Sequence, residues 1–259
     1  MADVSPMGGK AASLTIMVAV IGLYVLMAGS SQASDITIYT EDYPPYSFMA
    51  DDGMVEGRAT VRVRRIMAEA GLSYEIRVLP WPRAEFRARK EKQAFIYSLA
   101  RSSERSAHYD WIAPIAKPDM YLFARTDDKR TVSLETLRRG EFVAVCTEKD
   151  ASCGIIRRAG IPEERLLIGA SAGSSEAMMI LYGRADLFLG DKRLHPVRVA
   201  SDEIPPGSIR PALKLDEDIS FYLAAGFQVD ESFRTRAREA YARLAARGEI
   251  DVYEGNTRP

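Results

Sequence analysis

The residue best suited to binding chemistry is Arg105, which lies seven positions after Ser98. The apolar run Ala94–Ala100 predicts a short buried strand, and a loop rich in hydroxyl groups follows it. Ligands of open α/β sheets bind where the chain leaves the carboxyl ends of the strands. A guanidinium at that edge offers a planar fork of donors that suits a carboxylate. The alternative is a surface arginine paired with Glu104 or Asp110, because most arginines are solvated.

Two aromatic residues follow other predicted strands of the same half of the chain. The β-branched, alternating segment Ile36–Thr40 predicts one strand and Tyr74–Leu79 predicts another, with an amphipathic helix between them. Alternation of strands and helices predicts right-handed crossovers and a parallel sheet. Tyr43 and Trp81 then lie at the carboxyl edge beside Ser98. Their alternatives are packing against the neighbouring prolines for Tyr43 and a place in the lobe core for Trp81.

The second half of the chain repeats this pattern without a detectable sequence repeat. Its predicted strands are Phe142–Val145, Leu166–Gly169 and Asp186–Leu189, and the polar residues that follow them are Thr147, Ser171 and Asp191. Helix amino termini near Thr147 and Ser174 would favour an anion. For Asp191 the alternatives are a pair with Lys192 or Arg193, or a helix cap. If the two edges face each other, Arg105 and Asp191 provide one positive and one negative anchor, which matches a zwitterion.

These elements predict an α/β fold of two lobes, each a βαβ sheet with flanking helices. Residues 34–124 and 215–259 form the first lobe and 125–214 the second, with the first crossing between lobes at about 123–127. The closing strand Ile219–Ala225 and the helix from Asp230 return the chain to the first lobe, so two strands form a hinge.

The first 33 residues differ from the rest of the sequence. Lys10 precedes an apolar run from Ala11 to Gly29, and the small residues Ser31 and Ala33 have the spacing that a signal peptidase recognises. We expect a signal peptide over 1–33, cleaved after Ala33, and a periplasmic protein. The alternative is an uncleaved membrane anchor, because the run is nearly long enough to span a bilayer.

Charge and cysteine content argue against nucleic-acid-binding and metal-binding functions. The 35 basic and 36 acidic residues give a net charge of −1, which argues against a nucleic-acid partner. Cys146 and Cys153 close a small loop and predict a disulfide in an exported protein. Two cysteines with the distant His108 and His195 do not predict a metal site, and we expect no cofactor.

The sequence from 35 to 255 resembles the bacterial extracellular solute-binding proteins of family 3, the polar amino-acid-binding components of ABC importers. The segments that carry the resemblance are 40–46, 98–105, 183–191 and 248–250. The resemblance implies a type II periplasmic-binding-protein-like fold, an ABC permease as partner and a monomer that is not an enzyme. It implies that Arg105 grips a ligand α-carboxylate, Ser98 assists it and Asp191 accepts from the α-ammonium, with Tyr43 and Trp81 near the aromatic wall.

The sequence departs from the family at two places. Ala100 stands where a second hydroxyl commonly follows Ser98, and Arg58-Ala59-Thr60 stands where an Asp often follows the glycine before the first helix. The resemblance implies that the solute is an amino acid or a related carboxylate. The loops of Thr147 and Ser171 would contact the solute when the second lobe closes. Two other functions stay open: a periplasmic dehydratase or lyase, for which Glu41 and Asp42 are the nearest acid–base candidates, and a sensor that acts through a partner protein.

Overall fold

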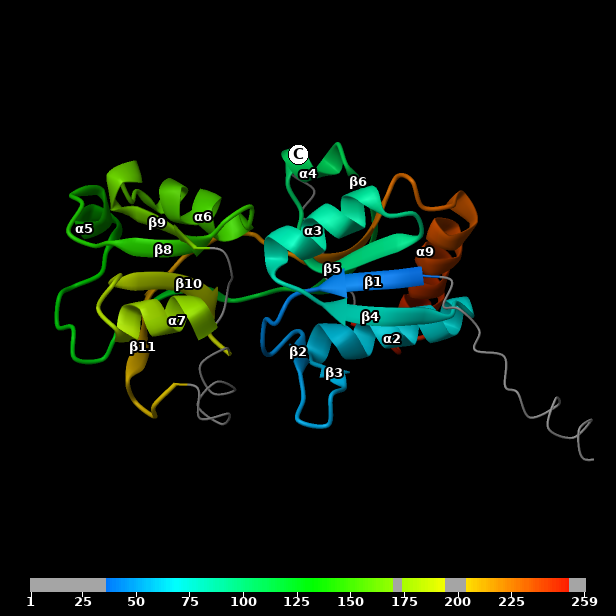
Figure 1. The fold of residues 1–259 in the computed structure, drawn as a ribbon, viewed down its shortest axis with the longest axis horizontal. Coiled ribbons are helices and arrows are strands. Elements are labelled where there is room, and N and C mark those ends of the chain that lie inside the picture. Colours follow the sequence, from blue (N-terminus) through cyan, green and yellow to red (C-terminus); the bar gives the residue numbers. More distant parts are fainter. Residues whose placement is uncertain (1–35, 170–173, 194–203, 252–259) are drawn as a thin grey trace, which may run out of the picture. The chain divides into compact units, whose positions relative to one another are not determined.

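The computed structural model describes residues 36–169, 174–193 and 204–251, and these contain two mixed five-stranded sheets (Figure 1). The first sheet has the order β4-β1-β5-β12-β6. Its strands are β1 (Ile36–Thr40), β4 (Tyr74–Val78), β5 (Ala94–Ala100), β6 (Tyr109–Ala116) and β12 (Phe221–Gly226). β1, β4 and β5 are parallel, as the sequence predicts, and β12 is antiparallel to β5 and β6.

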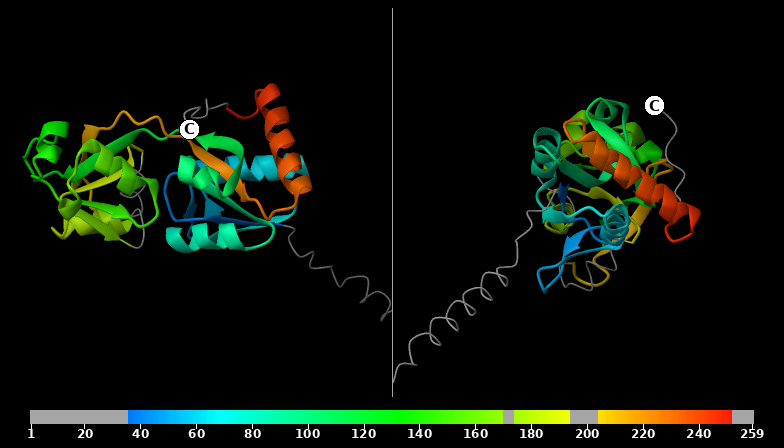
Figure 2. Two further views of the ribbon diagram at one scale, coloured as in Figure 1. Left: turned by 90° about the horizontal axis from the view of Figure 1, so that it is seen from above. Right: turned by 90° about the vertical axis from the view of Figure 1, so that its right-hand side faces the viewer.

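Helices cover both faces of the first sheet because its strands alternate buried side chains between the faces. Ile38 and Phe95 pack with Val63 of α2 (Arg58–Ala70) on one face. Tyr39 and Ile96 pack with the helix α3 (Trp81–Lys90) on the other. The last helix, α9 (Glu231–Ala246), lies beside α2 (Figure 2), and the guanidinium of Arg236 donates to the carbonyl of Ala70 at 2.8 Å. The short α4 (Ser103–Ser106) follows β5.

The second sheet has the order β11-β7-β10-β8-β9 and is built in the same way. Its strands are β7 (Met120–Arg125), β8 (Ala144–Thr147), β9 (Leu166–Gly169), β10 (Leu187–Asp191) and β11 (Ile209–Lys214). The helix α7 (Ser174–Leu181) covers one face through Ile180, and α5 (Leu134–Arg138) and α6 (Ala151–Ala159) cover the other. A 3₁₀ turn, η1 (Glu163–Arg165), precedes β9, and a disulfide joins Cys146 of β8 to Cys153 of α6.

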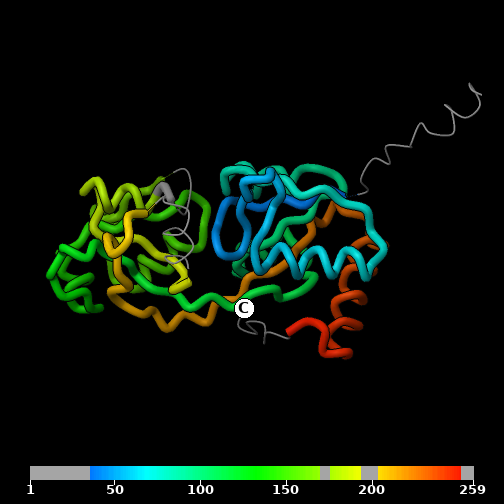
Figure 3. The backbone as a smooth tube through the Cα atoms, turned by 90° about the horizontal axis from the view of Figure 1, so that it is seen from below, coloured from blue at the N-terminus to red at the C-terminus, as the bar shows by residue number. Residues whose placement is uncertain are grey.

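Two short segments, 117–119 and 215–220, connect the sheets and run side by side (Figure 3). The amide of Leu215 donates to the carbonyl of Met120 at 3.0 Å, and Lys117 pairs with Asp218 at 3.2 Å. The sequence-based position of the first crossing, 123–127, is wrong. All of β7 pairs with β10 and β11 of the second sheet, so the crossing precedes Met120.

Further differences from the sequence-based expectations concern edge strands and a small hairpin. The strands predicted from the sequence do not include β6, which contains Pro114, or β11, which contains Pro211. Both strands lie at the edge of a sheet, where a proline costs no ladder hydrogen bond. A small hairpin between β2 (Phe48–Met49) and β3 (Val55–Glu56) has its tip at Asp51–Gly53.

The expected signal peptide, residues 1–33, lies outside the described residues. Within the part of the chain that the structure describes, no helix is both long enough and apolar enough to cross a membrane.

Candidate functional site

The order of the strands creates a crevice at the carboxyl edge of each sheet. In the first sheet, the connection from β1 leads to β4 on one side, and the connection from β4 leads back to β5 on the other side. The strand order therefore reverses between β1 and β5, which is where ligands of open α/β sheets bind. Glu41 directly follows β1, and Ser98 lies near the carboxyl end of β5. Both residues are therefore at this point of reversal. The order β9-β8-β10 creates the same reversal in the second sheet, beside Thr147 and Asp191.

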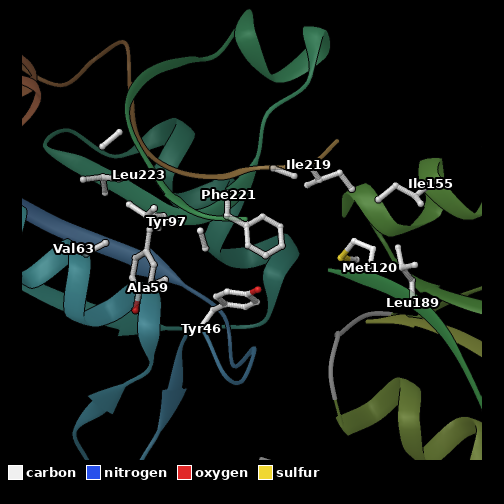
Figure 4. Close-up of a cluster of buried hydrophobic side chains, with 14 of the residues drawn as sticks. Tyr46, Ala59, Val63, Tyr97, Met120, Ile155, Leu189, Ile219, Phe221 and Leu223 are labelled. Carbon is white, nitrogen blue, oxygen red and sulfur yellow. The ribbon is translucent and has the colours of Figure 1, made fainter. Parts of the chain in front are cut away.

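Residues from both lobes line a small cavity with a volume of about 20 Å³. Figure 4 shows Phe221 of the first sheet facing Met120 and Leu189 of the second sheet and Ile155 of α6, with Ile219 between them. The other lining residues are polar or small, apart from one tyrosine: Glu41, Tyr43, Ser98, Asp150, Ala151, Ser152 and Glu176. The space exceeds what one water requires and is far below that of an amino acid. A solute therefore needs the two sheets to separate further or the lining side chains to move.

Glu41 is a buried carboxyl of this cavity with a strongly shifted pKa. Its side chain is 6 % exposed, and burial raises its pKa well above 4.5, reinforced by the nearby charges of Asp150 and Glu176. Asp42 acts in the same direction, whereas Arg105 lowers the pKa of Glu41. A buried carboxyl of this kind prefers its protonated form unless a positive charge arrives.

This perturbation predicts a pH-dependent gain in stability for Glu41→Gln. A carboxyl whose folded pKa is raised destabilises the folded protein as pH increases above 4.5, because the unfolded chain ionises it more readily. Glu41→Gln should therefore unfold a few degrees above the wild type at pH 7 to 8, with a difference that vanishes near pH 4. Thermal unfolding across this range checks the prediction. The exposed Glu164→Gln is the control, and an equal gain at every pH would contradict the assignment.

Two polar side chains of the cavity region differ in how they are bonded. The hydroxyl of Thr147, fully buried, donates to Glu176 Oε1 at 2.9 Å and so orients that carboxylate. Ser98 is 7 % exposed, and its buried hydroxyl has no hydrogen-bond partner among the described residues. Ser98 adopts a positive φ of 61° within β5, and its side chain lines the cavity. Thr147 itself does not line it.

Arg105 lies beside this cavity and is held by main-chain carbonyls. Nη1 donates to Ala100 at 2.9 Å, and Nη2 donates to Lys149 of the second lobe at 2.7 Å. The guanidinium lies over the ring of Trp81, 5.3 Å from its centroid. The bond to the Lys149 carbonyl joins the two lobes, and Arg105 also lines a larger hollow.

That hollow has a volume of about 590 Å³ and is lined by charged residues of both signs. Arg101, Arg105, Glu148 and Glu217 are among them, and Asp150 and Ala151 line both the hollow and the small cavity. The hollow and the cavity are therefore adjoining parts of one region between the sheets.

Trp81 is buried in the core between α3 and the first sheet and lines neither space. Its indole Nε1 donates to the same Lys149 carbonyl, at 3.2 Å. Trp81 and Arg105 thus converge on one acceptor from the second lobe. The structure places Trp81 behind Arg105, as the support of its guanidinium.

Asp191 forms a second contact between the lobes. Its carboxylate is fully buried and accepts from the hydroxyl of Tyr46 at 2.7 Å and from the amide of Asp119 at 2.7 Å. Arg193 donates to it from its main chain, Nε and Nη2 at 2.7–2.8 Å. Burial alone would raise the pKa of Asp191, but the hydrogen bonds from Arg193 and Tyr46 outweigh it and lower the pKa. The pair with Arg193 is one of the two alternatives that the sequence left open.

The structure brings Ser98 and Tyr43 together at the small cavity and places Arg105 at its margin. Tyr43 stacks on Tyr46 with ring centroids 5.9 Å apart. Asp191 lies in the adjacent contact between the lobes, where a ligand ammonium would have to displace Arg193. Ser171 and His195 lie outside the described residues.

Sequence reasoning missed Glu176, Asp150 and Tyr46 as functional residues. Asp150 caps α6 by accepting from the amide of Ser152, and Glu176 lies in the first turn of α7. Each has the position of an ordinary helix-start acid in the sequence, and only the strand order brings both to the cavity.

Two mixed α/β lobes, joined by two segments and sharing a charged cavity at their facing strand edges, define a periplasmic-binding-protein-like molecule. The model of one family, the bacterial extracellular solute-binding proteins, family 3, matches residues 36–254. The chain therefore belongs to this family, and a search of curated protein sequences found no match.

Solved structures support the same fold at low sequence identity. A histidine kinase sensor domain with similarity to periplasmic binding proteins is 18% identical, with a TM-score of 0.72 over 83% of this chain and 91% of that chain. An ancestral arginine-binding protein bound to arginine is 15% identical, with a TM-score of 0.70 over 82% and 93%. The arginine-, lysine-, histidine-binding protein ArtJ from Geobacillus stearothermophilus is 13% identical, with a TM-score of 0.68 over 83% and 90%.

Proposed function

We propose that this chain is the periplasmic binding component of an ABC importer, capturing a small polar solute between its lobes and delivering it to a membrane permease. The observation that carries the proposal is the cavity lined by charged and aromatic residues of both sheets. The family, the extracellular solute-binding proteins, supports the binding role. Export by a signal peptide over 1–33 belongs to the proposal, and sequencing of the amino terminus of the periplasmic protein tests it.

Closure follows from contacts that exist only when the lobes approach. The Lys149 carbonyl accepts from Arg105 and Trp81, and Asp191 accepts from Tyr46, each across the gap between the lobes. A solute that bridges both lobes adds differential affinity for this arrangement and shifts the population toward it. The segments 117–119 and 215–220 are the proposed hinge, which makes 34–116 with 221–251 the first lobe and 120–214 the second.

Arg105 is the proposed anchor for a carboxylate of the solute. In the bound state the carboxylate would lie in the hollow that Arg105 lines and accept from its guanidinium. Because a hydrogen bond to a charged group contributes about 1.5–3 kcal/mol, Arg105→Ala should weaken binding at least tenfold. Calorimetry with L-arginine and L-glutamine, the solutes of two ancestral neighbours, measures the change. The exposed Arg139→Ala serves as control, and an unchanged affinity of Arg105→Ala would remove Arg105 as the anchor.

The direct test of the proposed function is uptake. Cells lacking the chain should lose import of the bound solute, and purified protein should return the solute chemically unchanged after stoichiometric binding. Turnover of the solute would instead favour an enzyme that uses the perturbed Glu41 as an acid or base.

A sensor is the second candidate, favoured by the likeness to a histidine kinase sensor domain. In that case the closed form is recognised by a signalling partner in place of a permease. Normal import in cells lacking the chain, with loss of a solute-induced transcriptional response, would identify this role.

A further inference from the structure

We propose that the lobes of the empty protein close with the uptake of a proton, because closure brings Glu41 of the first lobe close to Asp150 and Glu176 of the second. Closure without a solute should then become more favourable as pH falls. The inference goes beyond the proposed function, since it concerns the protein before any solute binds.

The composition of the small cavity is the first observation. Glu41, Asp150 and Glu176 line it, and none of its described lining residues is Lys, Arg or His. Glu41 directly follows β1 of the first lobe, whereas Asp150 caps α6 and Glu176 lies in the first turn of α7, both in the second lobe. Three carboxyl groups from two lobes therefore share one enclosed space. Like charges repel more strongly in such a space than in water.

The hydrogen bonds of the three carboxyl groups are the second observation. Asp150 accepts from the amide of Ser152 at 2.8 Å, and Glu176 accepts from the hydroxyl of Thr147 at 2.9 Å. Among the residues that the structure describes, none donates a hydrogen bond to the carboxyl of Glu41. A proton therefore neutralises Glu41 at the lowest cost, because no hydrogen bond to its ionised form is lost.

The surroundings of Glu41 oppose its ionised form in the closed protein. Burial is the largest cause that raises the pKa of Glu41, and the charges of Asp150, Glu176 and Asp42 add to it. Arg105 is the one charge that acts in the opposite direction among the causes of this shift. Its guanidinium donates to two main-chain carbonyls and does not line the cavity, so it compensates only part of the effect.

Tyr43 is the remaining titratable group of the cavity. Burial raises its pKa well above 10, and the neighbouring charges of Asp150 and Asp191 raise it further. The phenol therefore stays neutral at every pH at which the carboxyl groups titrate. A change in the charge of the cavity between acid and neutral pH falls on Glu41.

Separation of the lobes removes the cause of the perturbation. The second-lobe wall of the cavity includes Ile155 of α6 and Leu189 of β10, so separation exposes Glu41 to water and moves it away from Asp150 and Glu176. Its pKa then returns toward 4.5, and the closed form binds the proton more tightly than the open form. Between the two pKa values, the ratio of closed to open protein should increase by up to about tenfold for each unit that pH falls.

The experiment is small-angle X-ray scattering of the purified protein, freed of solute by unfolding and refolding, from pH 5 to pH 8. The radius of gyration of the wild type should be smaller at pH 5 than at pH 8. Glu41→Gln should have the smaller radius at every pH, because its amide is neutral. Circular dichroism at each pH checks that the proteins are folded.

Two further variants make the test specific. Asp150→Asn keeps an acceptor for the cap of α6 and should weaken the pH dependence without abolishing it, because burial of Glu41 remains. Glu148→Gln, at an exposed position of the loop after β8 that does not line the cavity, should keep the pH dependence of the wild type.

Two results would overturn the proposal. One is a wild-type radius of gyration that is the same from pH 5 to pH 8, and the other is an equal pH dependence in Glu41→Gln. Neither result would bear on the proposed function, because solute binding and uptake test that function separately.

Discussion

Asp191→Ala is expected to lower the free energy of unfolding by about 3 kcal/mol, the lower end of the cost of breaking a buried ion pair. The lower end applies because the side chain of Arg193 is 39% exposed and regains water when its partner is lost. The Asp119 amide and the Tyr46 hydroxyl also lose their acceptor. For a chain of this size such a loss lowers the melting temperature by about 6–12 °C.

The loss of stability caused by Asp191→Ala should depend on pH. Because the folded pKa of Asp191 is lowered, its contribution is fully present above pH 3.8 and is lost as pH falls through the folded pKa. The difference between wild type and Asp191→Ala should therefore be large at neutral pH and shrink in acid. Urea unfolding measures both values.

Asp218→Ala is the matched control for this variant. Asp218 is exposed and pairs with Lys117 on the connecting segments, so its loss should cost less than about 1 kcal/mol. Equal effects of the two substitutions would show that the contact between Asp191, Tyr46 and Arg193 does not stabilise the protein.

Removal of the disulfide is expected to have the next largest effect. Cys146 and Cys153 are seven residues apart, and the loop entropy for so short a closure corresponds to about 2.5 kcal/mol. Both residues are buried, so Cys146→Ala with Cys153→Ala should lower the melting temperature by about 5–10 °C. The loop that the disulfide closes also presents the Lys149 carbonyl to Arg105, so this contact should weaken as well.

Reduction of the wild type is the control for the double substitution. A reductant should lower the wild-type melting temperature to nearly that of the double variant and leave the variant unchanged. If complete reduction, verified by thiol titration, leaves the wild-type value unaltered, the disulfide does not contribute as argued.

The parallel core of both sheets was predictable from the sequence. Segments such as Ile36–Thr40 and Ala94–Ala100 are short and apolar and are separated by amphipathic helices, a pattern that few topologies satisfy. The edge strands β6 and β11 were missed because Pro114 and Pro211 argue against a strand unless its place at the edge is known. The local sequence does not show whether a strand will lie at the edge of a sheet.

The candidate site was predictable only as a location. The strand ends identified the neighbourhood of Ser98, Tyr43 and Arg105, since strand order fixes where loops converge. The bonding of Arg105 to Lys149, and of Asp191 to Tyr46, depends on how the two lobes meet. These contacts join residues more than 40 positions apart, so local sequence patterns do not predict them. Glu176 was missed for the same reason.

The most direct test of solute capture is a crystal structure of the protein with the solute that it binds most tightly. The proposed function predicts that the solute lies between the two sheets, with its carboxylate against the guanidinium of Arg105. A solute that contacts only one sheet, or whose carboxylate lies away from Arg105, would contradict this prediction.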